Sequence, residues 1–300
     1  MEGFEMGKVK VLTARQAADL IKDGDTVTLS GFVANGIAEA LNAAAEERFL
    51  ETGHPKDLTL FWVAGTGNKD GSHADHYAHE GMVKKVIGGH FNFVPKICEM
   101  LSENKIEGYN VPQGAIAQML RDNAAHKVGT ISHVGIGTFA DPRNGGGRLS
   151  EKTKEDIVKV IELEGQEQLF YPRIPLDVAF IRGTYADELG NITLEKEMAP
   201  LDATSQAMAV HNNGGLVVVQ VERVVKAGHL DPKLVKIPGI YVDAVVECPA
   251  DDPKQSQSIN CTYDPAYAGN TQVPVSSLEP KKLDAKKIIG RRFFFKPRLV

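Results

Sequence analysis

The residues best suited to chemistry lie in three turns that combine glycine with uncharged polar groups. The stretch VGIGTFADPRNGGG (residues 134–147) has five glycines in fourteen residues and follows a β-branched run. Gly31 follows another such run, and Pro112-Gln113-Gly114 stands just before a helical pattern. Glycine allows positive φ and a close approach of the backbone to a ligand. Free N–H groups at a helix start, beside the Gln113 amide, suit a carboxylate or acyl oxygen.

Two other interpretations of the glycine turns are a dinucleotide site and a purely structural corner. A dinucleotide fingerprint needs G-x-G-x-x-G after a strand. Neither GFVANG (residues 31–36) nor GIGTFA (residues 135–140) supplies the third glycine, and no Walker lysine is present. A dinucleotide site is therefore disfavoured, whereas packing alone stays open for each turn taken singly.

Three histidines at regular spacing, His73, His76 and His79, suggest a zinc site as one hypothesis. On a single helix, however, His79 is rotated by about 120° from His73. The H-E-x-x-H pattern that starts at His79 has Val83 in place of its second histidine. The favoured prediction is a polar helix start that leads into the apolar pattern of residues 82–87.

Three further candidates have a simpler structural alternative. Glu195 and Glu197 could act as an acid and base pair, but surface carboxylates around a turn are commoner. Cys98 could be a nucleophile with His90 as base, but a small buried hydrophobe is the usual state of such a cysteine. Arg143 could reach a phosphate or carboxylate, or could serve the turn alone.

Strand and helix patterns alternate along the chain. Apolar and β-branched runs predict strands at residues 26–30, 58–64, 133–136, 178–182 and 216–221. Helical spacing, with a capping box at Thr13, predicts helices at residues 13–21, 37–50, 115–125 and 204–212. This alternation is typical of an α/β fold with an open, mainly parallel sheet flanked by helices, which binds ligands beyond the carboxyl ends of its strands.

Composition and charge limit the class of protein. A net charge of −5 over 300 residues argues against a general nucleic-acid binder. Cys98, Cys248 and Cys261 lack C-x-x-C spacing, which fits a reducing compartment. The N-terminal residues lack the apolar stretch of a signal peptide, and no run of about eighteen apolar residues could span a membrane. The sequence therefore predicts a soluble, cytoplasmic protein with no metal, nucleic-acid or membrane partner.

The sequence resembles the family I coenzyme A transferases, and in particular the propionate or acetate CoA-transferase branch whose two halves are fused in one chain. The resemblance runs in family order from Lys10 to Arg292, through the glycine turns and Gln113. The matching stretches are DGDTVTLSGFVANGIAEAL, RFLETGHPKDLTL, HEGMVKKVIGGH, YNVPQGAIAQMLRD, VGIGTFADPRNGGG, TKEDIVKVIELEGQEQLFYP, FIRGTYADELGNITLEKE and VVVQVERVVKAGHLDPKLVKIPGIYVD.

The resemblance implies a ping-pong transfer between a short-chain acyl-CoA and a short-chain carboxylate, with coenzyme A as a substrate and no cofactor. A glutamate attacks the thioester to form an anhydride, and CoA thiolate then forms a glutamyl-CoA thioester. Gln113 matches the glutamine that contacts the substrate carboxylate. The loops that face the acyl group, whose backbone amides would stabilise oxyanions, carry Gly31, Phe32, Asn35, Gly135, Gly137 and Thr138.

The nucleophilic glutamate of the family lies in its second half, so we expect no catalytic residue in this chain. The sequence predicts an acyl-binding domain over residues 1–250, an extended connector over 251–283, and the start of a truncated second domain over 284–300. A glutamate-bearing second half or subunit, in a homo- or hetero-oligomer, would complete the site. The alternatives are a catalytically silent acyl-CoA or carboxylate binder and a thioester hydrolase of the same fold.

Overall fold

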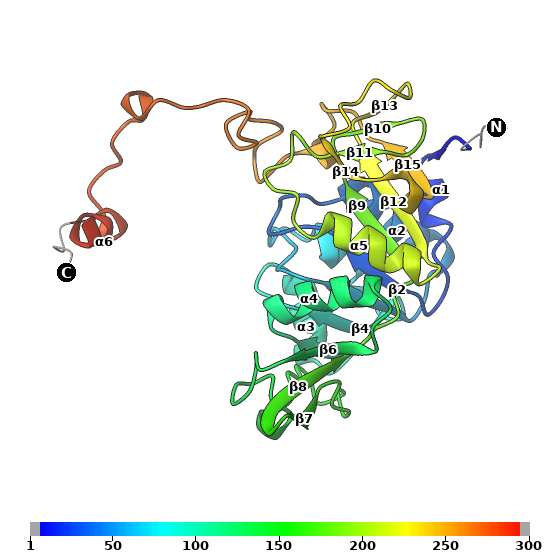
Figure 1. The fold of residues 1–300 in the computed structure, drawn as a ribbon, viewed down its shortest axis with the longest axis vertical. Coiled ribbons are helices and arrows are strands. Elements are labelled where there is room, and N and C mark those ends of the chain that lie inside the picture. The colour runs from blue at the N-terminus through cyan, green and yellow to red at the C-terminus, as the bar shows by residue number, and fades with distance from the viewer. Residues whose placement is uncertain (1–6, 295–300) are drawn as a thin grey trace.

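Eight parallel strands form the central sheet, in the order β1-β15-β12-β9-β2-β3-β4-β5. A computed structural model describes residues 7–294 of the chain, and it confirms the predicted open α/β sheet (Figure 1). The strands are β1 (Lys10–Leu12), β2 (Thr26–Leu29), β3 (Leu58–Trp62), β4 (Val83–Gly88), β5 (Glu107–Asn110), β9 (Val178–Arg182), β12 (Leu216–Val221) and β15 (Ala244–Glu247). All five side chains of β9 are buried, as expected where helices cover both faces of a parallel sheet.

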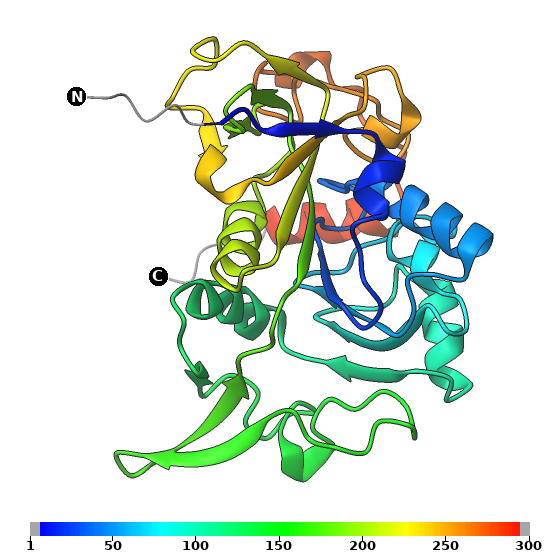
Figure 2. The same cartoon turned by 90° about the vertical axis from the view of Figure 1, so that its right-hand side faces the viewer.

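Helices cover both faces of this sheet (Figure 2). One apolar core joins the strands to α1 (Ala14–Ala18), α2 (Glu39–Thr52), the 3₁₀ turn η1 (His73–Tyr77) and α3 (Pro95–Ser102). The other core joins them to α4 (Gln113–Ala124) and α5 (Ala203–Asn212). Successive strand residues point to opposite faces, so Leu60 lies in the first core and Phe61 in the second.

Two smaller sheets flank the main one. The first contains β13 (Arg223–Val225), β10 (Tyr185–Asp187), β11 (Ile192–Thr193) and β14 (Val235–Ile237). The second is antiparallel, with β6 (Gly129–Ser132), β8 (Gln166–Pro172) and β7 (Lys159–Leu163), and it forms the lower end of the molecule in Figure 1. The glycine-rich stretch therefore connects two strands of this second sheet.

Two sequence predictions of local structure are wrong. The strand predicted over residues 133–136 is a turn, and β6 lies just before it. Gly135 has φ of +106° there, and the carbonyl oxygen of Val134 accepts a 2.6 Å hydrogen bond from the Tyr171 hydroxyl. The helix predicted to run on from His73 ends at η1, and residues 83–88 form strand β4. A strand buried on both faces shows the same closely spaced apolar residues as a helix.

In the C-terminal part of the chain, residues 253–257 pack against the main body, whereas later residues are exposed. Gln255, the last residue of η4 (Pro253–Gln255), is buried against Gln220 of the main sheet, and Gln257 is buried where its Nε2 donates to the Lys196 carbonyl at 2.7 Å. Residues 271–284, which include η5 (Val275–Ser277), are exposed and lead to α6 (Ala285–Phe294), away from the main body in Figure 1. The predicted division of the chain at residues 250 and 283 stays a prediction. None of the helices in residues 7–294 has the length and apolar character needed to cross a membrane.

The side chain of Gln220 in β12 connects residues 253–257 to the main sheet, and its replacement should lower the free energy of unfolding. Its Oε1 accepts a 2.9 Å hydrogen bond from the Ala40 N–H, and its Nε2 donates to the Lys254 carbonyl at 2.9 Å. Gln220→Leu leaves the Ala40 N–H and the Lys254 carbonyl without the Gln220 amide as a hydrogen-bond partner. We therefore expect a loss of about 3 kcal/mol in the free energy of unfolding, measured by urea denaturation. Gln166→Leu, at an exposed site, is the control, and equal losses in both variants would contradict the account.

Candidate active site

Four loops meet at the carboxyl edge of β2, β3, β4 and β5. They comprise residues 30–37, 63–68, 89–90 and 111–113, which follow these strands in turn. The first two loops are joined because the Gly67 N–H donates to the Val33 carbonyl at 3.0 Å. Parallel strands present their carboxyl ends at one edge, where open α/β sheets bind their ligands.

The loop after β2 is a tight turn with an exposed aromatic ring. Gly31 has φ of +125°, a backbone conformation that favours glycine, and a Cβ there would also lie 3.1 Å from the Asn35 carbonyl oxygen. The N–H of Phe32 donates to the Asn35 carbonyl at 2.9 Å, and the Asn35 N–H donates back at 3.0 Å. Both N–H groups are thus used inside the turn, whereas the Phe32 side chain remains 45% exposed.

Gln113 begins α4 and is exposed at the same edge. A Cβ added to Gly89 would lie 3.2 Å from the Gln113 Cα and 2.2 Å from the Val63 carbonyl oxygen. The loops after β3, β4 and β5 are therefore in close contact, and glycine at position 89 permits this contact. The arrangement presents an uncharged amide donor at the first turn of a helix, where the macrodipole favours anions.

The glycine-rich loop is held by its own charged residues. The Asp141 carboxylate accepts from the Gly137 N–H at 2.9 Å and from Arg143 Nε and Nη2 at 2.9 and 2.8 Å. The Arg143 guanidinium holds the pKa of Asp141 well below its usual range. Because Arg143 also binds Glu167 at 2.9 Å, its contacts support the turn interpretation of this residue. The Thr138 hydroxyl donates to the Gly135 carbonyl at 2.8 Å, which closes the start of the loop.

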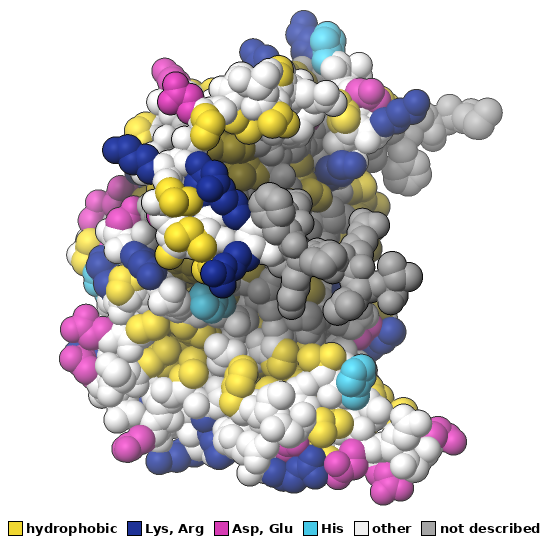
Figure 3. Space-filling view, turned by 90° about the vertical axis from the view of Figure 1, so that its left-hand side faces the viewer, with side chains coloured by type: hydrophobic (Ala, Val, Ile, Leu, Met, Phe, Trp, Pro, Cys, Tyr) yellow, Lys and Arg dark blue, Asp and Glu magenta, His cyan; other side chains and the backbone are white. Residues whose placement is uncertain are grey.

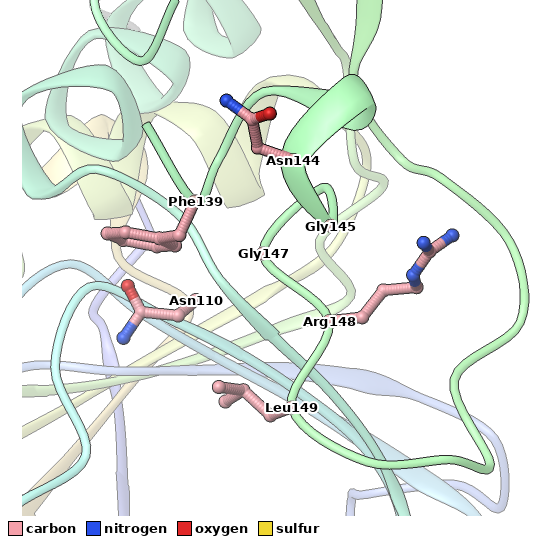
Figure 4. Close-up of a pocket in the computed structure, with 7 residues that line it drawn as sticks. All are labelled: Asn110, Phe139, Asn144, Gly145, Gly147, Arg148 and Leu149. Atoms are coloured by element: carbon pink, nitrogen blue, oxygen red, sulfur yellow. The ribbon is translucent and has the colours of Figure 1, made fainter. Parts of the chain in front are cut away.

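The end of the glycine-rich loop returns to β5 and borders an open cavity of about 340 Å³ (Figure 4). The Asn110 N–H donates to the Gly147 carbonyl at 2.7 Å, and a Cβ on Gly147 would lie 2.2 Å from the Asn110 carbonyl oxygen. The cavity is lined by Asn110, Phe139, Asn144, Gly145, Gly147, Arg148 and Leu149. Close approach to β5 is therefore the reason for glycine at position 147.

The predicted site residues fall on two connected parts of the edge. Gly31, Phe32 and Asn35 lie on the loop after β2, and Gln113 follows β5, three strands along the sheet, where it lies beside Gly89. Gly135, Gly137 and Thr138 lie on the glycine-rich loop, which joins the edge through Asn110 and Gly147.

Some backbone N–H groups on these loops already donate hydrogen bonds within the chain. The N–H of Gly137 donates to Asp141, and that of Thr138 donates to the Gly135 carbonyl at 3.0 Å. For the N–H groups of Gly31 and Gly135, residues 7–294 supply no acceptor. Together with the N–H of Gln113 in the first turn of α4, these N–H groups are among the donors that remain for an oxyanion.

Sequence reasoning missed several residues of this edge: Gly65, Gly67, Gly89, Asn110 and Phe139. The sequence Gly65-Thr66-Gly67 follows a fully buried run of residues, and this pattern could have predicted the loop after β3. Asn110 and Phe139 carry no comparable signal, because only the return of the loop to β5 brings them together.

The three histidines bind carboxylates in the structure. His73 Nδ1 and His76 Nε2 each lie 2.8 Å from Glu39, and His76 Nδ1 and His79 Nε2 contact Glu46, the latter at 2.7 Å. Within residues 7–294, no group of side chains is arranged to hold a metal ion. Burial alone would raise the pKa of Glu39, but the hydrogen bonds from His73 and His76 outweigh it and lower this pKa to about 2.

The contacts of Glu197 and Cys98 indicate structural rather than catalytic roles for both residues. The prediction of a surface carboxylate is wrong for Glu197, which is buried and whose Oε1 lies 3.1 Å from Arg182 Nε. Burial raises the pKa of Glu197, and the Arg182 charge offsets only part of that shift. The Cys98 thiol donates to the Phe91 carbonyl at 3.3 Å, and burial raises its pKa, which disfavours a thiolate nucleophile.

Comparison with known proteins identifies the family. The sequence profile of the coenzyme A transferase family matches residues 11–248. The chain is 41% identical to the acetate CoA-transferase YdiF of Escherichia coli over 97% of its length and 55% of the relative's. It is 39% identical to the caffeate CoA-transferase of Acetobacterium woodii, over 94% of this chain and 54% of the relative. The crystal structure of the Escherichia coli acyl-CoA transferase apoenzyme superimposes with a TM-score of 0.89 at 39% identity, over 97% of this chain and 55% of that one.

The chain therefore belongs to the coenzyme A transferase family. It spans about half the length of the curated relatives it matches. The predicted resemblance and the predicted fold class are both confirmed.

The approach of Gly147 to β5 can be tested against a glycine of the same loop. Gly147 and Gly137 have φ of +71° and +72°, but no atom lies within 4 Å of a Cβ added at Gly137. Gly137→Ala should therefore show only the positive-φ cost of about 1 kcal/mol, whereas Gly147→Ala should lose about 2 kcal/mol more, measured by urea denaturation. Equal losses would show that the contact with Asn110 is absent.

The histidine and carboxylate cluster should give the protein a pH-dependent stability. Burial lowers the pKa of His76, but Glu39 and Glu46 outweigh burial and raise it above 6.5. The stabilisation from His76 is thus complete below pH 6.5 and is lost as the pH rises through the folded pKa. The stabilisation from Glu39 is complete above pH 4.5 and is lost as the pH falls toward its folded pKa of about 2. Between these limits the wild type should be most stable.

His76→Gln should reduce the free energy of unfolding most between these limits and least at high pH. The measurement is urea denaturation across the pH range, with His229→Gln at an exposed site as the control. A loss in His76→Gln that is constant from acidic to alkaline pH would refute the assigned charge on His76.

Proposed function

We propose that the chain is the acyl-binding half of a CoA-transferase that moves coenzyme A between a short-chain acyl-CoA and a short-chain carboxylate. The observation that carries the proposal is the exposed Gln113 amide, set among glycine loops at the carboxyl edge of the parallel sheet. Membership of the coenzyme A transferase family supports the reaction class. The identity to an acetate CoA-transferase supports a small acid of the acetate, propionate or lactate type.

On this proposal the chain binds and polarises the acyl group, and a second half supplies the nucleophile. The glutamate carboxylate attacks the thioester carbonyl, CoA thiolate leaves, and an acyl-glutamyl anhydride forms. The thiolate then attacks the glutamyl carbonyl, which releases the free acid and leaves a glutamyl-CoA thioester. An acceptor carboxylate reverses both steps. The sequence of steps is balanced with coenzyme A as substrate and needs no metal, flavin or nicotinamide.

The residues of this chain would act on the oxygen atoms of those intermediates. Gln113 Nε2 would donate to a carboxylate or acyl oxygen, and the N–H groups of Gly31 and Gly135 would donate to the developing oxyanion. A donor placed in this way is worth about 3 kcal/mol of transition-state stabilisation. Uncharged donors suit this task, because they bind the oxygen without forming an ion pair with the incoming acid.

A second half or subunit is part of the proposal because the chain matches about 55% of its relatives' length. Figure 3 views the side toward which the C-terminal segment extends in Figure 1, and hydrophobic side chains form a band across the lower half of that face. Phe32 and Phe139 are 45% and 54% exposed. Exposed aromatic rings beside a binding site fit a surface that a partner half, in a homo- or hetero-oligomer, would cover.

Acyl exchange between propionyl-CoA and isotopically labelled acetate tests the proposal, with the CoA pool followed by mass spectrometry. The chain is assayed alone and with a separately expressed glutamate-bearing half. We expect exchange only when both are present, and Gln113→Ala should slow it about 100-fold. Gln118→Ala, further along α4, is the matched control.

Other outcomes would change the assignment. Exchange by the chain alone would show a nucleophile within it. Absence of exchange with both halves, together with retained thioester binding, would support the alternative of a catalytically silent acyl-CoA binder. Release of free CoA without an acceptor acid would indicate a hydrolase.

A further inference from the structure

We propose that a second open cavity, between residues 68–73 and residues 253–260, binds a free α-amino acid with a small apolar side chain. We call it the His73 cavity; its volume is about 390 Å³, and Asp70, His73 and Lys254 are among the residues that line it. Gln113 and the glycine-rich loop are not among its lining residues, so it is separate from the proposed acyl site. The inference goes beyond the proposed function and does not depend on it.

The side chain of His73 is the feature that points to a ligand. His73 is only 8% exposed, and its φ of +62° is uncommon for a residue other than glycine. Its Nδ1 lies 2.8 Å from Glu39 Oε2, whereas nothing within residues 7–294 pairs with its Nε2. A buried polar atom without a partner is costly, and a ligand in the cavity can supply the missing hydrogen bond.

Glu39 determines which kind of partner His73 Nε2 requires. The pKa of Glu39 is lowered to about 2, so its carboxylate is ionised at neutral pH and can only accept hydrogen bonds. The hydrogen atom of neutral His73 therefore lies on Nδ1, between the imidazole ring and Glu39. His73 Nε2 then has a lone pair, and its partner must be a donor such as an N–H or O–H group.

The negative charge of Asp70 makes an ammonium group the preferred donor. Burial alone would raise the pKa of Asp70, but hydrogen bonds from Ser72 and Asn68 outweigh it and lower this pKa, so the carboxylate is ionised. Its donors, the Asn68 Nδ2 at 2.8 Å and the Ser72 N–H at 3.1 Å, are uncharged and leave its charge in place. An ammonium group has three N–H bonds, so it can donate both to His73 Nε2 and to Asp70.

Residues 253–260 supply the positive charge that would hold the carboxylate of an amino acid. The Lys254 side chain is 45% exposed, and its Nζ lies 4.0 Å from Glu47 Oε1, which is too far for a strong ion pair. The Lys254 carbonyl accepts from Gln220 Nε2 at 2.9 Å, so the backbone is fixed while the ammonium group can turn toward the cavity. Acceptors at His73 and Asp70 and a cation at Lys254 match the two charged groups of an amino acid.

The remaining walls and the volume fit a small apolar side chain. Ala34 and Ile37 are buried and Ile259 is 42% exposed, and all three line the cavity. A dry cavity of about 150 Å³ in another protein binds benzene, so the His73 cavity has room for L-valine and several water molecules. Contact between the valine side chain and these residues removes apolar surface from water.

The test follows binding of L-valine to the isotopically labelled chain by NMR, through the His73 ring and the backbone amides of residues 253–260. Two analogues that each lack one charged group are titrated in parallel. One is 3-methylbutanoate, which lacks the ammonium group, and the other is 2-methylpropylamine, which lacks the carboxylate. We expect L-valine to bind with a Kd of about 1 mM and each analogue to bind at least about tenfold more weakly at this site.

Two variants test the groups that would hold the two charges. His73→Asn removes the Nε2 acceptor, and asparagine tolerates the positive φ of this position, so the Kd of L-valine should rise about tenfold. Lys254→Met should cause a similar rise for L-valine but leave the affinity for 2-methylpropylamine unchanged, because this analogue has no carboxylate. Lys233→Met, at an exposed site, is the control and should change neither affinity.

Absence of any change in these NMR signals at about 50 mM L-valine would overturn the inference. Equal affinities for L-valine and either analogue would also overturn it, as would a Kd that Lys254→Met leaves unchanged; this last measurement decides the matter if His73→Asn does not fold. Acyl exchange by the two halves is a separate measurement. Its absence would refute the transferase proposal alone, and absence of L-valine binding would refute the amino-acid site alone.

Discussion

The parallel register of β2, β3, β4 and β5 is the constraint on which the candidate site depends. Because these strands run in the same direction, their carboxyl ends meet at one edge, and the loops after them are neighbours. Residues far apart in the sequence, such as Gly31 and Gln113, are placed on that edge by strand order alone. The glycines then allow the loops to touch, as Gly89 does against Gln113 and Gly147 does against β5.

Charged side chains near this edge are mostly paired with one another. Arg143 is engaged by Asp141 and Glu167, and His73 and His76 are engaged by Glu39. These residue types suggest ligand binding from sequence, but each satisfies a carboxylate that the fold partly or wholly withdraws from water. Among the described residues, several amide side chains and backbone N–H groups at this edge remain without such a partner. An environment of this kind suits a reaction whose charge develops on carbonyl oxygens.

The sequence predicts β2, β3, β9 and β12 of the main sheet, but it does not predict β1 or β15, it reads β4 as helical, and it reveals little of the packing of loops. The strands at residues 178–182 and 216–221 have the predicted bounds, because continuous apolar runs bounded by polar residues define buried parallel strands. The turn at Gly135 was indistinguishable from a strand by composition. Burial of Glu197 beside Arg182 depends on a partner fifteen residues away along the chain, which local pattern cannot reveal. The cavity beside Phe139 likewise exists only because a long loop returns to β5.

Hydrogen exchange of the backbone amides, with and without propionyl-CoA, tests most directly whether this edge of the sheet binds the acyl group. The account predicts slower exchange at the loops around Gly31, Gly67, Gly89, Gln113 and the stretch 134–149, with little change elsewhere. Protection confined to another region, such as the histidine cluster on α2 and η1, would contradict it.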